Sequence, residues 1–187
     1  MANRNTQGFG LVPAGTLGQT PATSGTGKYK IDAGYATTIF HGGAVSSTAG
    51  YIVEGQGTAD NPMIGVLNGI FYNAATTLKP TFSNHYVQVT PANSEDIDAF
   101  VFDNPQQQYV VATDDSVAQS GYLETYDMNT SAGSTTTGKS SATLDIGDTS
   151  ADAASFRLLR SAEDPENDEN AAFRSVVVVP NLIELQS

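Results

Sequence analysis

Two dense apolar runs stand out along the chain, residues 51–53 and residues 63–72, with a glycine-rich turn between them. This pattern predicts a hairpin at the centre of a small β-barrel. Gly65 and Gly69 interrupt the second run, and glycine inside an apolar strand marks a bulge or a bend at a barrel corner. We therefore expect the other strands to be arranged around residues 50–73.

Alternating apolar and polar positions predict further strands towards the C-terminus. Residues 97–102 and 109–112 flank a turn at residues 103–105, which predicts a second hairpin. Residues 156–161 alternate in the same way. Four consecutive valines at residues 176–179 predict a buried strand, because β-branched side chains suit a pleat that is covered on both faces.

Taken together, these patterns predict an all-β chain with three parts. Residues 1–27 form an extended N-terminal arm, and residues 28–92 form a β-barrel module. Residues 93–187 form an acidic second module, again a small β-barrel or β-sandwich, with a C-terminal core strand. Residues 129–139 are nearly all Ser, Thr, Gly and Ala, which is typical of a flexible surface loop.

The arm carries only scattered apolar residues, too few to bury a core of their own. Two interpretations are open. The arm is either a frayed terminus or an extended segment that lies over a neighbouring subunit and becomes ordered on binding. In the second case its apolar residues are the candidate partner-binding residues, namely Phe9, Leu11, Val12 and Leu17.

Charge is distributed unevenly in this chain of net charge -12. Residues 1–90 carry four Lys/Arg and three Asp/Glu, whereas residues 91–187 carry four and seventeen. Nucleic acid is not an expected partner, because binding to it depends on neutralising phosphates. We expect the neutral half and the arm to face a partner and the acidic half to face solvent.

The sequence contains no cysteine, which excludes disulfides and thiolate chemistry. Its N-terminus has one arginine and no apolar signal region, and no window approaches a membrane-spanning length. We therefore expect neither secretion through a cleaved signal nor a membrane partner.

Candidate catalytic chemistry is sparse. His41 and His85 lie in no metal-binding spacing, so a structural role is the better interpretation of both. The chain has no G-x-S-x-G elbow, which leaves a hydrolase without support. Residues 25–29 lack the first glycine of a phosphate loop and have Tyr29 where its Ser or Thr belongs, and residues 55–60 lack the third glycine of a dinucleotide fingerprint. We predict no catalytic residue and no cofactor.

A carboxylate cluster near the C-terminus has the oxygen ligands that calcium prefers. It lacks the glycine and the spacing of an EF-hand, so we expect a solvated acidic loop and no metal. Its members are Glu163, Asp164, Glu166, Asp168 and Glu169.

The order of segments resembles the head-decoration, or cement, proteins and related minor capsid proteins of tailed bacteriophages. A Gly/Thr/Pro-rich arm enters "YKIDAGYATTIFHGGAV", and "MIGVLNGIFY", "DIDAFVFDNPQQQYVV" and "FRLLRSAEDPENDENAAFRSVVVVPNLIEL" follow. The likeness covers about residues 28–185.

This resemblance implies a β-rich, non-enzymatic protein that binds the outside of an icosahedral shell. The implied partner is the major capsid protein, whose neighbouring subunits the N-terminal arm bridges, and further copies of the chain are a second possible partner. The implied location is the outer surface of the virion, after assembly in the host cytoplasm. The chain is longer than the smallest members of the family, and the resemblance assigns no role to its acidic module.

The alternative function is a receptor- or carbohydrate-binding β-module of a virion. Such a module is expected to present aromatic platforms, and this chain has eight tyrosines and no tryptophan. Co-sedimentation with capsids or with glycan beads discriminates between the two functions.

Overall fold

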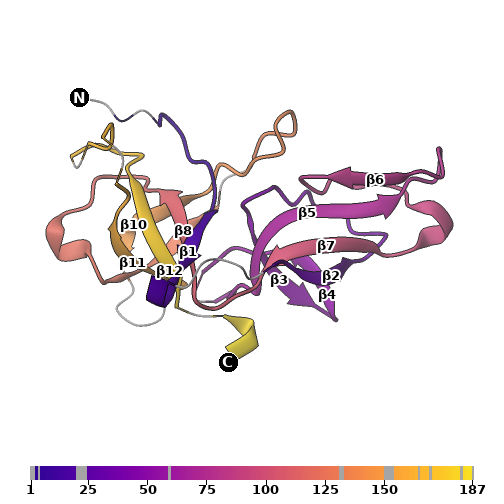
Figure 1. The fold of residues 1–187 in the computed structure, drawn as a ribbon, viewed down its shortest axis with the longest axis horizontal. Helices are drawn as coiled ribbons and strands as arrows, with labels where there is room; N and C mark the ends of the chain where they lie inside the picture. The colour runs from indigo at the N-terminus through magenta and orange to yellow at the C-terminus, as the bar shows by residue number, and fades with distance from the viewer. Residues whose placement is uncertain are drawn as a thin grey trace.

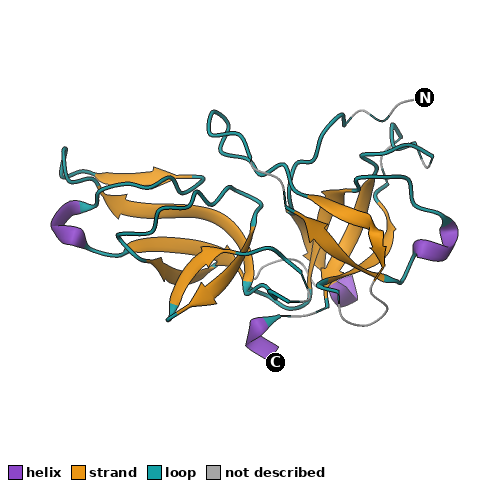
Figure 2. Ribbon diagram, turned by 180° about the vertical axis from the view of Figure 1, so that it is seen from behind, coloured by secondary structure: helices purple, strands orange, loops and turns teal. Residues whose placement is uncertain are grey.

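The computed structural model shows an all-β protein, as predicted, whose strands form two antiparallel six-stranded sheets in the described part of the chain. The two sheets lie side by side along the long axis (Figures 1 and 2). The described residues are 3, 5–19, 25–58, 60–130, 133–149, 154–163, 165–168, 170–181 and 183–186. No helix among them is long and apolar enough to cross a membrane.

The first sheet has the strand order β2-β7-β5-β3-β4, and β6 pairs with the far end of β5. Its strands are β2 (Gly27–Ile31), β3 (Ala44–Thr48), β4 (Tyr51–Glu54), β5 (Gly65–Asn73), β6 (Pro80–Ser83) and β7 (Ile97–Phe102). The terminal strands β2 and β4 contact each other, so this sheet curls into the first barrel.

The second sheet has the strand order β1-β8-β12-β11-β9-β10. Its strands are β1 (Val12–Thr16), β8 (Gln107–Ala112), β9 (Thr125–Asn129), β10 (Thr143–Thr149), β11 (Phe156–Ser161) and β12 (Ser175–Pro180). A bridge between Thr113 and Leu144 brings β10 back towards β8 and curls this sheet into the second barrel. Four single-turn 3-10 helices complete the described elements: η1 (Leu17–Gln19), η2 (Ala92–Ser94), η3 (Gln119–Gly121) and η4 (Glu184–Gln186).

The hairpin predicted at residues 50–73 is wrong, because β3 lies between its two strands. Ala44 pairs with Val66 of β5, and Val45 pairs with Glu54 of β4. Only two residues of β3 are apolar, so its sequence gives a weak strand signal. Its first three residues are nevertheless buried, which places β3 at the centre of the sheet.

The hairpin predicted at residues 97–112 is also wrong. β7 pairs with β2 and β5 in the first barrel, whereas β8 pairs with β1 and β12 in the second. β7 alternates between buried and half-buried residues throughout, and β8 does so up to Val111, and this pattern defines a buried face without defining a pairing partner. The chain therefore crosses between barrels at residues 103–106, and not at the expected boundary between residues 92 and 93.

The charge division changes with this boundary. Residues 27–102 carry three lysines and six carboxylates, whereas residues 103–187 carry four Lys/Arg and fourteen carboxylates. Glu95, Asp96 and Asp98 cause the change, because they belong to the first barrel. The first barrel is therefore mildly acidic and not neutral.

Residues 3 and 5–19 of the arm lie on the second barrel of the same chain, where β1 pairs with β8, whereas Gly27 already belongs to β2 of the first barrel. The Asn3 side chain donates to the Ala172 carbonyl at 2.8 Å, and the Asn5 side chain donates to Ser175 Oγ at 2.9 Å. Leu11 is 1% exposed and belongs to the second core. The expected arm at residues 1–27 thus includes a strand of the chain's own sheet, because β8 offers backbone groups for pairing.

Apolar contact joins the two barrels. Ala44, Met63 and Val66 come from the first barrel but pack in the core of the second. Ile183 forms a bridge with Met63, so the C-terminal segment also returns to the junction, where η4 lies below the two sheets in Figure 1. The orientation of the first barrel is therefore fixed by buried side chains.

Candidate functional site

An aromatic patch occupies the outer face of the first barrel. Phe71 pairs with Phe82 on one side and with Asp98 on the other, and Gly69 pairs with Phe100. Alternate residues of a strand point to the same face, so the three phenylalanines share it. Phe82 is 63% exposed, and its ring centroid lies 6.0 Å from that of Phe100. We call Phe71, Phe82 and Phe100 the aromatic patch.

Gly69 makes room for this patch. A Cβ atom at Gly69 would lie 3.0 Å from Cζ of Phe82, closer than side-chain atoms normally approach. The absence of a side chain at Gly69 therefore lets the Phe82 ring of β6 lie across β5. The apolar sequence of β5 did not predict this contact.

Charged residues continue the same face beside the patch. Asp98 Oδ2 lies 2.8 Å from Lys28 Nζ, and Asp98 Oδ1 lies 2.6 Å from Lys30 Nζ. Burial raises the pKa of Asp98, but the two lysines outweigh it and hold that pKa below its usual value. The hydrogen bond with Asp98 in turn raises the pKa of Lys30. Asp98 is therefore an ionised carboxylate that two cations compensate.

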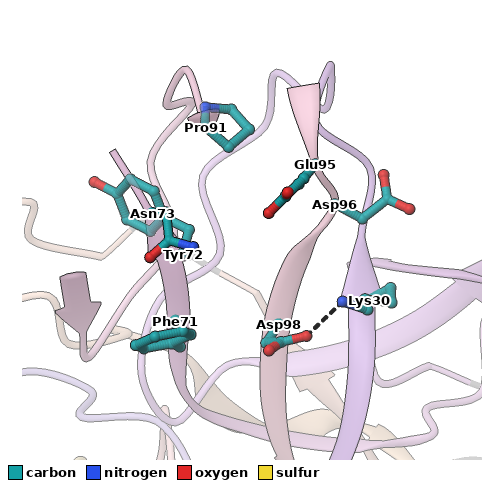
Figure 3. A pocket seen from close by; sticks show the side chains of 8 residues that line it. All are labelled: Lys30, Phe71, Tyr72, Asn73, Pro91, Glu95, Asp96 and Asp98. Atoms are coloured by element: carbon teal, nitrogen blue, oxygen red, sulfur yellow. Dashed lines mark ion pairs between the residues drawn. The ribbon is translucent and has the colours of Figure 1, made fainter. Parts of the chain in front are cut away.

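An open hollow of about 290 Å³ lies where β5 and β7 diverge, beyond the Phe71–Asp98 pair (Figure 3). Glu95 points into the hollow towards Asn73, whereas the Asp96 carboxylate points away from it (Figure 3). Asp96 accepts a hydrogen bond from the Tyr51 hydroxyl at 3.2 Å. The lining residues are Lys30, Phe71, Tyr72, Asn73, Pro91, Glu95, Asp96 and Asp98. Together with the aromatic patch they suit non-covalent binding through apolar contact and charge.

The four predicted partner-binding residues lie at the second barrel, away from this surface. Leu11 is buried and Phe9 is half-buried, so both are engaged within the chain. Val12 is 45% exposed and Leu17 is 39% exposed. Only Val12 and Leu17 of the four present much apolar surface, and a partner role for them stays a prediction.

His41 and His85 lie at the junction of the barrels. His41 Nδ1 lies 2.9 Å from the Asn68 carbonyl oxygen, and the His41 amide donates to the Gly138 carbonyl at 2.8 Å. The His85 ring stacks on Phe40 with centroids 6.2 Å apart. These contacts give both imidazoles structural partners.

The Ser/Thr/Gly-rich loop is docked at this junction in its described part, residues 133–140. Asn84 Nδ2 donates to the Thr137 carbonyl at 2.9 Å, and Ser140 N donates to the His41 carbonyl at 3.0 Å. Gly138 has a φ of 73° and lies against Asn84 and His85, so a side chain there is disfavoured by both conformation and space. Residues 134–137 are exposed, as expected of a surface loop, and the loop also connects the two barrels through these hydrogen bonds.

The acidic loop is held by amide side chains. The Ser175 amide donates to Asn167 Oδ1 at 2.9 Å, and Asn167 Nδ2 donates to the Ser175 carbonyl at 2.8 Å. Two members of the predicted carboxylate cluster, Asp164 and Glu169, lie outside the described residues. Within the described ranges, no three His, Asp or Glu side chains converge as metal ligands would.

The aromatic patch is not among the features predicted from the sequence, although one signal was available. Phe100 alternates with Ile97, Ala99 and Val101, which are all buried, so it occupies a position of β7 where a polar residue is typical. Phe82 gave no comparable signal, because its exposure depends on β6 being a short strand paired with the end of β5.

No protein-family model, no curated protein and no solved structure matches this chain.

Proposed function

We propose that this chain decorates the outside of a tailed-bacteriophage head and stabilises the shell by bridging subunits of the major capsid protein. The observation that carries the proposal is the aromatic patch, because a cluster of apolar side chains on a solvent-exposed surface marks a protein contact site. Phe82 alone is 63% exposed. The identity of the partner comes from the resemblance of the chain's segments to head-decoration proteins.

The division of charge supports one orientation on the shell. The second barrel and the tail carry fourteen carboxylates and four cations, so packing many copies of it close to encapsidated nucleic acid is unfavourable. The outer face of the first barrel then faces the shell. The second barrel faces solvent together with the arm strand β1 that pairs in it, which differs from the expectation that the arm faces the partner. Attachment rests mainly on apolar contact, so its affinity changes little with salt concentration.

Co-sedimentation with heads that lack this protein tests the proposal. Phe82→Ser lowers the affinity roughly tenfold or more if Phe82 is a central anchor of the contact. Leu123→Ser is the matched control, because Leu123 is 62% exposed but lies on the second barrel. Failure of the wild-type chain to pellet with heads, or equal losses in the two variants, would overturn the proposal.

A receptor- or carbohydrate-binding role is the second candidate, and the hollow favours it. Aromatic, amide and carboxylate groups meet there through Tyr72, Asn73 and Glu95, and sugar sites use the same groups. Retention on glycan beads together with no binding to heads would select this function.

A further inference from the structure

We propose that the hollow of the first barrel receives one basic side chain, Arg or Lys, from the partner protein. An apolar residue near it in the partner's sequence covers the aromatic patch. The inference rests on the proposed function for the identity of the partner, but the recognition chemistry follows from the hollow itself.

The apolar wall of the hollow suits the stem of a long basic side chain. Phe71, Tyr72 and Pro91 line it together. The methylene groups of Lys and Arg pack on such surfaces while their charged ends reach polar groups. A cation near an aromatic ring also gains from the negative face of the ring.

The charges of the hollow select a cation over an anion. Asp98 is compensated by Lys28 and Lys30, and Asp96 accepts from the Tyr51 hydroxyl. The exposed Glu95 carboxylate points into the hollow and acts on the Lys30 charge only from a distance, since no hydrogen bond or ion pair joins it to another described residue (Figure 3). An incoming guanidinium or ammonium group supplies a close cationic partner for the Glu95 carboxylate.

The hollow and the aromatic patch are continuous, because Phe71 belongs to both. A partner segment that spans them needs a basic residue and an apolar residue on the same side. In an extended segment these residues are two positions apart, since alternate side chains share a face. The proposed recognition element is therefore a basic residue, any residue and an apolar residue in sequence.

Titration of the full chain with short peptides, followed by amide NMR shifts, tests this inference. The probes are acetyl-Arg-Thr-Leu-amide and acetyl-Gln-Thr-Leu-amide. We expect the Arg peptide to shift the amides of residues 71–73 and 95–96 and to bind roughly three- to tenfold more tightly than the Gln peptide. Equal binding of the two peptides would overturn the inference.

Two variants locate the preference. Glu95→Gln keeps the size of the side chain and removes its charge, so it abolishes the preference for the Arg peptide. Glu163→Gln makes the same change on an exposed residue of the second barrel and leaves the preference intact. Retention of the preference in Glu95→Gln overturns the inference even if the protein is folded and binds the peptide.

Binding to heads separates this inference from the proposed function. If Glu95→Gln binds heads as tightly as the wild type while Phe82→Ser does not, the hollow is unused and the decoration function stands. If the wild type prefers the Arg peptide but does not bind heads, the decoration function is overturned and the inference about the hollow is supported. If sedimentation shows a dimer that Phe82→Ser dissociates, a second copy occupies the face and the inference is overturned.

Discussion

The two barrels differ in whether their strands come from one continuous part of the chain. All strands of the first barrel come from one continuous stretch, residues 27–102, whereas the second combines β1 from the N-terminal arm with strands from residues 107–180. The chain thus starts in the second barrel, leaves it to form the first and then returns. Pairings between distant residues cost more loop-closure entropy, so the second barrel depends on both ends of the chain.

The barrels also place their aromatic residues differently. Tyr109, Tyr126 and Phe156 are buried in the second barrel. The two tyrosine hydroxyls donate to backbone carbonyls, Tyr109 to Phe102 at 3.1 Å and Tyr126 to Gly121 at 3.0 Å. The first barrel buries Tyr86 in the same way, with its hydroxyl donating to the Tyr35 carbonyl, but it also exposes Phe82. The second barrel therefore uses aromatic rings for stability, whereas the first leaves some of them available for a partner.

The largest expected effect is in the core of the second barrel. Val178 is buried between β8 and β11. Val178→Asp prevents that barrel from folding, because a buried unpaired charge is not tolerated. Val178→Ala lowers the unfolding free energy by about 1–3 kcal/mol through lost transfer energy and a residual cavity.

Chemical denaturation followed by near-UV circular dichroism measures both variants at Val178. The control is Val87→Ala at a position that is 40% exposed on the first barrel; it changes the unfolding free energy by less than about 0.5 kcal/mol. Wild-type stability of Val178→Asp would show that β12 is not a core strand.

The arm gives the next largest effect and tests whether it belongs to the second barrel. Leu11→Ala lowers the unfolding free energy by about 2–4 kcal/mol, because Leu11 is fully packed. Leu17→Ala, at a residue 39% exposed, costs less than about 0.5 kcal/mol. Equal and small effects in the two variants would mean that the arm is detached in solution.

The smallest expected effect is in the first barrel and depends on pH. The Tyr29 hydroxyl donates to Asp103 at 2.7 Å, and burial, that hydrogen bond and the Asp103 charge raise the pKa of Tyr29 to about 12. An unfolded tyrosine loses its proton near about pH 10. As pH rises from there towards 12, the folded chain holds more protons than the unfolded chain, so the unfolding free energy falls.

Tyr29→Phe isolates this contribution. At pH 7 the variant is less stable by about 0.5–1.5 kcal/mol, the net value of one hydrogen bond. The difference between variant and wild type shrinks as pH rises through the same window, because only the wild type loses the contact. A difference that stays constant up to about pH 12 would contradict the assignment of the raised pKa to Tyr29.

Patterns of apolar residues in the sequence, alternating or continuous, were sufficient to place several strands and their buried faces. Residues 97–102 and the valines at 176–179 are strands where the pattern predicts them, and the described valines are buried. Such patterns report local preference and burial, both of which side-chain chemistry controls directly. Fold class and much of the core therefore follow from the sequence alone.

Strand partners and the binding surface were decided only by the tertiary structure. The pattern of β7 and β8 fits a hairpin as well as it fits two separate barrels, and the arm residues fit a free segment as well as β1. Sheet pairing joins backbone N–H and C=O groups, which do not distinguish one strand from another. The choice of strand partner is therefore made by the packing of the whole chain. The hollow beside Glu95 arises from that packing, because β5 and β7 meet at Phe71 and Asp98 and then diverge.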